Sequence, residues 1–465
     1  MHLNLFFKTA TLLLAAALML SGCSSSIMPD LSRLYRTPDL PDHSQNWSSE
    51  KTQRPVILIH GAFGSRLSNS ETNDELWPGN LWRILFNNYE DIAYEIDAET
   101  LMPAKSNLVA TGVTDQVVGK DYYGAIIRTL EQVGGYTRGE PGTTPASQTR
   151  QYYVFIYDWR EDNVQTAHKL DDLIEKIRKD YGSPDLTVDI IAHSMGGLIT
   201  RYYLRYGRED VLNDNDFPVN GHGFQRVNNV ILLGTPNLGS VSAVLEVLHG
   251  LKVGLNRIPS QVMLTWPSTY QLFPHTINNS MITLDGRILD RDFFDSNVWQ
   301  RFEWSIFYPE TRQQIIDEKG EDYYKLLVQY FNKQIERGRR FVWSLSVPTP
   351  KSDFQYIVFG GDCELTPARL LVEEVDGESM VRLYPDEIQN PIAGIDYEVL
   401  MLEPGDGRVT KPSLLAREAL DPTVPRHRYS HFPLDYATML CETHDTLTGN
   451  IHFQDNLLNI LLTDE

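Results

Sequence analysis

The sequence has few cysteines and no cluster of metal-binding residues. Only 3 of its 465 residues are cysteine, namely Cys23, Cys363 and Cys441. No group of cysteines or histidines has the spacing of a structural or catalytic metal site. We therefore expect neither a bound metal nor a cofactor.

Basic residues are also scarce relative to acidic ones. The chain carries 41 Lys and Arg against 62 Asp and Glu, a formal net charge of -21. Nothing in it resembles the basic stripe that neutralises phosphates, so we exclude nucleic acid as a partner. The same balance disfavours electrostatic adhesion to anionic lipid.

The apolar run at the amino terminus is short. It extends from Thr9 to Leu20 after Lys8, whereas a transmembrane helix needs about 20 residues. A charged start, an apolar middle and small residues at a cleavage site are typical of a signal peptide. The tetrad Leu-Ser-Gly-Cys that ends at Cys23 resembles the lipobox of bacterial lipoproteins.

This resemblance implies a lipoprotein signal peptide over residues 1–22 and lipidation of Cys23. Several acyl chains, each worth about 0.8 kcal/mol per buried CH₂, make a stable membrane anchor. Ser24 after the cysteine resembles the pattern sent to the outer membrane, with the protein facing the periplasm. Residues 23–53, rich in Ser, Pro and Asp, are predicted to be a tether.

Two cysteines remain in the rest of the chain. In an oxidising periplasm Cys363 and Cys441 can form a disulfide, because both are placed at the ends of neighbouring predicted strands. Two buried free thiols are the alternative, and the sequence leaves the choice open.

The segment 187–207 reads as a strand, an abrupt turn and a helix. Val188 to Ala192 is β-branched and apolar, as in a strand buried on both faces of a parallel sheet. Gly196 and Gly197 allow the following helix to pack closely against that sheet. This arrangement exposes the hydroxyl of Ser194 on a strained corner, where a serine can act as a nucleophile. The alternative is a serine that only caps the helix.

Five motifs, in this order, resemble the lecithin:cholesterol acyltransferase family. They are Pro-Val-Ile-Leu-Ile-His-Gly-Ala-Phe-Gly-Ser-Arg-Leu at 55–67, Leu-Trp-Pro-Gly at 76–79, Tyr-Asp-Trp-Arg at 157–160, Ala-His-Ser-Met-Gly-Gly at 192–197 and Gly-Thr-Pro-Asn-Leu-Gly-Ser at 234–240. The resemblance extends over most of the chain after about Pro55. It implies an α/β-hydrolase that acts on lipids as an acyltransferase or phospholipase.

The resemblance predicts an α/β fold with a mostly parallel sheet flanked by helices. We expect the hydrolase core in residues 54–240 and 351–463, and a large cap or lid insertion in residues 241–350. The cap is rich in aromatic residues between Phe293 and Tyr308. These can line a lipid pocket, although most large apolar residues are simply buried.

A catalytic triad in the order Ser, Asp, His is expected for this fold. The loop Gly-Asp-Gly-Arg-Val at 405–409 is where the family carries its acid, which implies Asp406. Most members have Thr where this chain has Arg408, so Asp362, which follows a predicted strand, remains an alternative.

The base is expected on the loop before the last helix. His444 lies there, between the last predicted strand and the closing helix. His431 precedes that strand and His452 falls in the helix, so both are weaker candidates.

The remaining candidates are the oxyanion donors and the residues near the loop that follows the first predicted strand. By analogy with α/β-hydrolases, the backbone N–H groups of Ala62 and Met195 would form the oxyanion hole. His60 is expected to support this loop rather than transfer protons. Trp77 is a candidate wall of an acyl pocket or a packed core residue.

These residues predict a serine-dependent lipid acyl-ester hydrolase or O-acyltransferase that works through an acyl-enzyme on Ser194. Its partners would be a phospholipid or other acyl ester, an acceptor alcohol, and the membrane through Cys23. Two alternatives remain. One is a non-catalytic binding or scaffold lipoprotein on a hydrolase fold, and the other is an esterase for soluble esters or polyesters.

Overall fold

The computed structural model describes residue 31 and residues 54–117, 120–146, 149–350, 352–416 and 434–462. The predicted signal peptide, Cys23, His431 and nearly all of the tether lie outside these residues.

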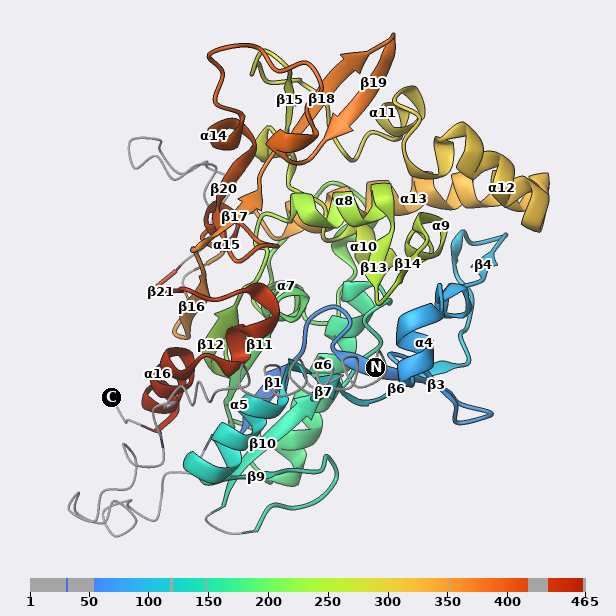
Figure 1. The fold of residues 1–465 in the computed structure, drawn as a ribbon. Helices are drawn as coiled ribbons and strands as arrows, with labels where there is room; N and C mark the ends of the chain where they lie inside the picture. Colours follow the sequence, from blue (N-terminus) through green and yellow to red (C-terminus); the bar gives the residue numbers. More distant parts are fainter. Residues whose placement is uncertain are drawn as a thin grey trace, which may run out of the picture. The chain divides into compact units, whose positions relative to one another are not determined.

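A parallel sheet of seven strands forms the centre of the protein (Figure 1). Every pairing within it is parallel, for example Ile57 opposite Ile190 and Leu232 opposite Val358. The strands, in their order across the sheet, are β21 (Tyr436–Leu440), β16 (Gln355–Gly361), β12 (Val227–Leu233), β11 (Val188–His193), β1 (Val56–Ile59), β10 (Arg150–Phe155) and β9 (Tyr136–Arg138). The predicted α/β fold is confirmed.

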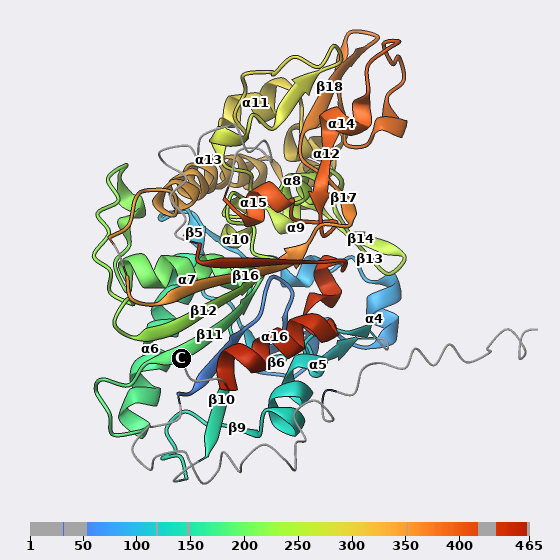
Figure 2. The same ribbon diagram turned by 90° about the vertical axis from the view of Figure 1, so that its left-hand side faces the viewer.

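Helices cover both faces of this sheet (Figure 2). Successive strand residues point to opposite faces, so Ile57 joins one core cluster and Leu58 the other. Helices α6 (Asn163–Asp180) and α7 (Met195–Tyr206) pack into the first cluster. Helix α5 (Gly124–Arg128) and helix α16 (Ile451–Leu462) pack into the second. Because both faces of the central strands are buried, nearly every residue of these strands must be apolar.

A small antiparallel sheet follows β1. It consists of β2 (Ser65–Asn69), β3 (Glu75–Trp77) and β6 (Leu108–Val113). The short helix α4 (Leu81–Phe86) comes directly after β3 and buries none of its residues.

The segment predicted to be the cap lies between β12 and β16. Its main elements are α8 (Val241–His249), β13 (Leu251–Val253), β14 (Asn256–Ile258), α9 (Ser260–Met263), α10 (Pro267–Tyr270), β15 (Met281–Thr283), α11 (Ser296–Arg301), α12 (Pro309–Lys319) and α13 (Glu321–Ser344). Several of its aromatic rings pack on one another and are buried, among them Phe293, Trp299 and Trp304. These rings form the interior of the segment.

A second excursion leaves the sheet after β16 and joins the first. It contains β17 (Glu364–Pro367), β18 (Leu370–Val375), β19 (Glu378–Arg382), α14 (Tyr397–Met401) and β20 (Leu402–Gly405). Strand β18 pairs with β15 and with β19 in one three-stranded sheet. Residues on both sides of position 350 therefore contribute to this small sheet.

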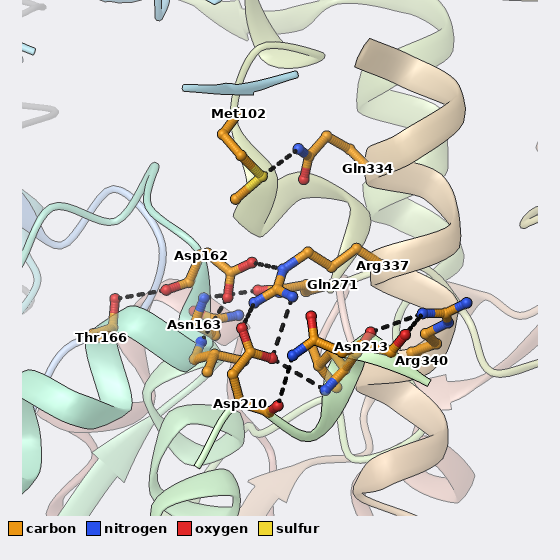
Figure 3. A network of polar contacts seen from close by, with 12 residues as sticks. Met102, Asp162, Asn163, Thr166, Asp210, Asn213, Gln271, Gln334, Arg337 and Arg340 are labelled. Carbon is orange, nitrogen blue, oxygen red and sulfur yellow. Dashed lines mark hydrogen bonds and ion pairs between the residues drawn. The ribbon is translucent and has the colours of Figure 1, made fainter. Parts of the chain in front are cut away.

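Helix α13 is attached to the core by a partly buried ion-pair network (Figure 3). The guanidinium of Arg337 contacts the carboxylate of Asp162 and lies 2.9 Å from that of Asp210. Asp162 also caps α6, because its carboxylate accepts a hydrogen bond of 2.8 Å from the N–H of Val164. One arginine thus connects the second half of the chain to the start of a core helix.

Cys363 and Cys441 form a disulfide, with their Cα atoms 5.0 Å apart. Cys363 comes just after β16 and Cys441 just after β21, and these strands are neighbours in the sheet. Among the described residues, no helix is both long enough and apolar enough to cross a membrane.

Candidate active site

Ser194 occupies the sharp turn between β11 and α7. Its backbone has φ 54° and ψ -126°, a strained conformation for a residue with a side chain. Glycines make the turn possible, because a Cβ on Gly196 would lie 2.6 Å from the carbonyl oxygen of His60 and one on Gly197 would lie 2.0 Å from Oγ1 of Thr235. Ser194 is at the N-cap position, but its side chain makes no capping hydrogen bond.

The structure brings Ser194, His444 and Asp406 together from three distant parts of the chain. Nε2 of His444 is 2.9 Å from Oγ of Ser194, and Nδ1 of His444 is 2.8 Å from Oδ2 of Asp406. His444 starts a short helix after β21, and Asp406 follows β20. This is the geometry of a nucleophile, a base and an orienting acid.

The carboxylate of Asp406 is held in its charged form. Burial opposes the charge, but His444 and the backbone N–H groups of Val409 and Arg408 together lower the pKa of Asp406. These N–H groups donate to Oδ1 at 2.7 and 3.0 Å respectively. The side chain of Arg408 points elsewhere, to Glu246 and Asp445. The change from Thr to Arg therefore leaves the contacts of the acid intact, because the backbone makes them.

The alternative acid and base lie apart from this chain of hydrogen bonds. Asp362 pairs with Nζ of Lys411 at 2.7 Å. His452 is exposed on α16, and His431 lies outside the described residues.

The loop after β1 passes directly beside Ser194. A Cβ on Gly61 would lie 2.6 Å from Cβ of Ser194, so only glycine allows this approach. Ala62 follows Gly61 and therefore begins next to the nucleophile. Met195 is the first residue of α7, whose N–H has no acceptor within the helix. The N–H groups of Ala62 and Met195, the predicted oxyanion donors, therefore belong to the two segments that border Ser194.

Aromatic side chains hold this loop in place. The hydroxyl of Tyr157 donates to the carbonyl of His60 at 2.6 Å, and the two rings stack with centroids 4.0 Å apart. Burial lowers the pKa of His60 to about 4, so the ring is neutral and supports the loop. Nε1 of Trp77 donates to the carbonyl of Phe63 at 3.1 Å.

Trp77 is itself part of a buried aromatic cluster. Its ring contacts those of Phe63, Tyr89 and Trp159, and its side chain is 8% exposed. The structure thus places Trp77 behind the loop of Ala62. A role in binding an acyl chain stays a prediction.

Two buried residues that the sequence did not single out also border the site. Tyr123, just before α5, bonds to the N–H of Gly61, and His193 directly precedes Ser194. His193 was visible within the Ala-His-Ser-Met-Gly motif. No sequence signal could have linked it to Tyr123, which lies 70 residues away.

Among the described residues, no group of three or more His, Cys, Asp or Glu side chains is arranged to hold a metal ion. Ser194, His444 and Asp406 form a hydrogen-bonded chain of the kind found in serine hydrolases.

Part of the chain matches a known protein family. Residues 142–335 match the model of the family described as lecithin:cholesterol acyltransferase. An uncharacterized protein of Saccharomyces cerevisiae is 22% identical over 284 residues, which cover 57% of this chain and 36% of that protein. The aligned region therefore spans about a third of the length of that curated relative.

The chain also matches solved structures. A chain in the crystal structure of the Tle4–Tli4 complex is 17% identical with a TM-score of 0.53, and the match covers 90% of this chain and 100% of that one. The structure of EstA from Clostridium botulinum is 13% identical with a TM-score of 0.36, covering 90% and 89%. The chain has the α/β-hydrolase fold, and its resemblance to the lecithin:cholesterol acyltransferase family is confirmed over residues 142–335.

Proposed function

We propose that the protein is a serine-dependent acyl-ester hydrolase or O-acyltransferase that acts on lipids. The observation that carries this proposal is the continuous chain of hydrogen bonds from Ser194 through His444 to Asp406. The strained backbone of Ser194 adds to it, because such strain is found at functional sites.

In the first half of the reaction, Oγ of Ser194 attacks the ester carbonyl while Nε2 of His444 takes its proton. Asp406 keeps the imidazole in the correct tautomer and stabilises its positive charge. The N–H groups of Ala62 and Met195 bind the oxyanion, and each such donor is worth about 100- to 1,000-fold in rate. His444 then protonates the leaving alcohol, which leaves an acyl-enzyme.

In the second half, water or an acceptor alcohol attacks the acyl-enzyme. His444 removes the proton of the attacking hydroxyl and returns it to Ser194 as the carbonyl re-forms. Attack by water gives a free acid, and attack by an alcohol gives a new ester. Exclusion of water by the surroundings of Ser194 would favour transfer.

An exposed apolar surface supports a lipid substrate over a soluble one. Helix α4 presents Trp82, which is 74% exposed, and the adjoining β13–β14 turn presents Leu255, which is 71% exposed. The N–H of Leu255 bonds to the carbonyl of Leu85 at 3.2 Å, so helix and turn form one surface. The rings of Trp82 and the exposed Phe86 also contact each other on α4. Exposed apolar side chains that lie together in this way are typical of contact with a partner or a membrane.

The test of catalysis uses the chain from residue 24 onward, phospholipid vesicles with labelled acyl groups, and an alcohol acceptor. Wild type should release or transfer acyl groups, and Ser194→Ala should lose this activity. Ser344→Ala is the matched control, because it removes a buried serine hydroxyl that bonds within α13. The ratio of acid to new ester distinguishes hydrolase from transferase. Equal activity of Ser194→Ala and wild type would reject the proposal, and a wild type inert on every ester would favour a scaffold.

The test of the lipid substrate compares vesicles with a water-soluble short-chain ester. Trp82→Ala/Leu255→Ala should lower turnover of vesicles at least about 10-fold, because burial of each side chain in lipid is worth about 1.5–3 kcal/mol. Turnover of the soluble ester should stay within about twofold. Val399→Ala, a 72% exposed apolar residue on α14, is the control. An equal loss on both substrates would favour the soluble-ester alternative.

The site of action in the cell is a separate part of the proposal. Cys23 is the acylated first residue of the mature protein, which is held at the outer membrane and faces the periplasm. The lipobox-like tetrad that ends at Cys23 supports this. Labelled palmitate should be incorporated into the wild-type protein and not into Cys23→Ser, and cell fractionation would locate both.

A further inference from the structure

We propose that Tyr123 and His193 are positioning residues that connect the loop of Ala62 to the backbone of His444. The role rests on the proposed function. It concerns two buried polar side chains that take no part in the proton transfers described above.

The connection consists of three consecutive hydrogen bonds. The N–H of Gly61 donates to the hydroxyl of Tyr123 at 2.8 Å. This hydroxyl is 2.8 Å from Nδ1 of His193, and Nε2 of His193 is 3.1 Å from the carbonyl oxygen of His444. Both side chains are buried, with His193 7% and Tyr123 3% exposed. The series therefore runs through the interior, from the residue before Ala62 to the proposed base.

The hydrogen-bonding groups fit only one direction along the series. A carbonyl oxygen accepts and cannot donate, so Nε2 of His193 carries the hydrogen that binds His444. A neutral His193 then has a free lone pair on Nδ1, which accepts the hydrogen of the Tyr123 hydroxyl. The Tyr123 oxygen in turn accepts the N–H of Gly61. Burial first, and then repulsion by His444, lower the pKa of His193 to about 3, which is consistent with this neutral form.

Ring contacts make the series stiff. The rings of Tyr123 and His193 meet edge to face with centroids 5.7 Å apart, and those of His193 and His444 lie 4.9 Å apart. Each polar group would be unpaired and buried without its neighbour, which costs about 1–3 kcal/mol. The loop of Ala62 and the ring of His444 are thereby held in one arrangement, while Ser194 lies between them. Catalytic groups need placement within about 0.5 Å.

The first experiment compares Tyr123→Phe with Tyr330→Phe. Each removes one buried tyrosine hydroxyl, and Tyr330 donates to the carbonyl of Thr265 at 2.8 Å, in the segment 241–350. Tyr123→Phe should lower kcat by about 10- to 100-fold with KM within about twofold, because misplacement acts on the transition state. Tyr330→Phe should keep kcat within about twofold. Urea unfolding should show a loss of stability for both, larger for Tyr123→Phe because it leaves two buried groups without a partner and Tyr330→Phe leaves one.

The second experiment tests whether the two residues act as one unit. His193→Phe keeps a ring and removes two of the three hydrogen bonds, those to Tyr123 and to the carbonyl of His444. The kcat of Tyr123→Phe/His193→Phe should therefore fall by clearly less than the product of the two single effects. A double variant whose kcat falls by the product of the two single effects would overturn the proposal. Equal kcat for Tyr123→Phe and Tyr330→Phe would also overturn it. Wild type and Ser194→Ala are measured in the same assay. An inert wild type overturns the proposed function itself, which is a different result from an active wild type that is indifferent to Tyr123.

Discussion

The backbone of Ser194 explains why its hydroxyl faces His444 and not the helix that it begins. With φ at 54°, the residue turns its side chain away from the free N–H groups of α7. A typical N-cap serine has an extended backbone and bonds to those groups. The alternative that Ser194 only caps a helix is therefore wrong in its essential point, because the capping hydrogen bond is missing.

The identity of the acid can be tested at the same scale. Asp406→Asn should lower kcat about 10,000-fold, the size known for the acid of a serine-protease triad, because the amide favours the wrong tautomer of the base. Asp362→Asn is the matched control. It loses only the partly exposed pair with Lys411, so kcat should stay within about threefold. The reverse order of the two effects would assign the acid to Asp362.

At the scale of elements, the disulfide connects the ends of β16 and β21, close to the acid and the base. A Cβ on Gly361 would lie 2.7 Å from Cβ of Asp406 and 2.3 Å from the carbonyl of Glu442. The loops that carry Asp406 and His444 are therefore packed tightly at this point. Cys363 and Cys441, separated by 78 residues, close this region covalently.

Removal of the disulfide should lower the free energy of unfolding. For a loop of 78 residues, the loss of chain restriction in Cys363→Ser/Cys441→Ser should amount to about 4 kcal/mol. Urea unfolding of the chain from residue 24 onward would measure it. Reductant should bring the wild type to the level of the double variant and leave that variant unchanged. A variant as stable as the oxidised wild type would contradict the bond.

The attachment of α13 gives a second prediction at this scale. Arg337→Ala leaves Asp162 buried without its partner (Figure 3), which should cost about 3–5 kcal/mol of stability. Lys325→Ala on the same helix is the control. Its pair with Glu321 is largely exposed, so the cost should stay below about 0.5 kcal/mol. Urea unfolding of both variants tests the difference, and equal effects would argue against a buried network.

At the scale of the whole molecule, two buried histidines determine part of the stability against acid. The pKa of His193 is lowered to about 3 and that of His60 to about 4, mainly by burial. His193 faces Tyr123, His444, Asp445 and Asp406. A lowered pKa means that the unfolded chain binds protons that the folded chain does not. The contribution of these two histidines to the free energy of unfolding is therefore present above about pH 6.5 and is lost as the pH decreases.

The loss of unfolding free energy that His193 causes can be calculated without the exact pKa of its folded state. Between pH 7 and pH 5 the folded His193 stays neutral, so only the unfolded pKa of about 6.5 matters, and the loss is about 2 kcal/mol. His193→Gln should remove this part of the pH dependence of urea unfolding. His452→Gln, at an exposed histidine of α16, should not. An unchanged slope in His193→Gln would mean that His193 takes up a proton in the folded state.

Much of the architecture followed from local patterns in the sequence. Continuous apolar runs predicted buried parallel strands, and the spacing of Leu170, Ile174 and Ile177 predicted α6, because burial on two faces or on one stripe imposes these patterns. Ser194 could be named for the same reason, since the glycines that its turn requires lie within three residues of it.

Contacts between distant segments could not be read in this way. The sequence left Asp406 and Asp362 as alternatives, because both follow strands and only the folded chain shows which carboxylate lies 2.8 Å from His444. The pairing of β15 with β18 and the series through Tyr123 and His193 are likewise invisible in a linear pattern. The sequence by itself determined the buried strands of the core, helices such as α6 and the nucleophile, since these depend on neighbours along the chain. The tertiary structure decided the partners of the nucleophile, since hydrogen bonds depend on distances that folding alone establishes.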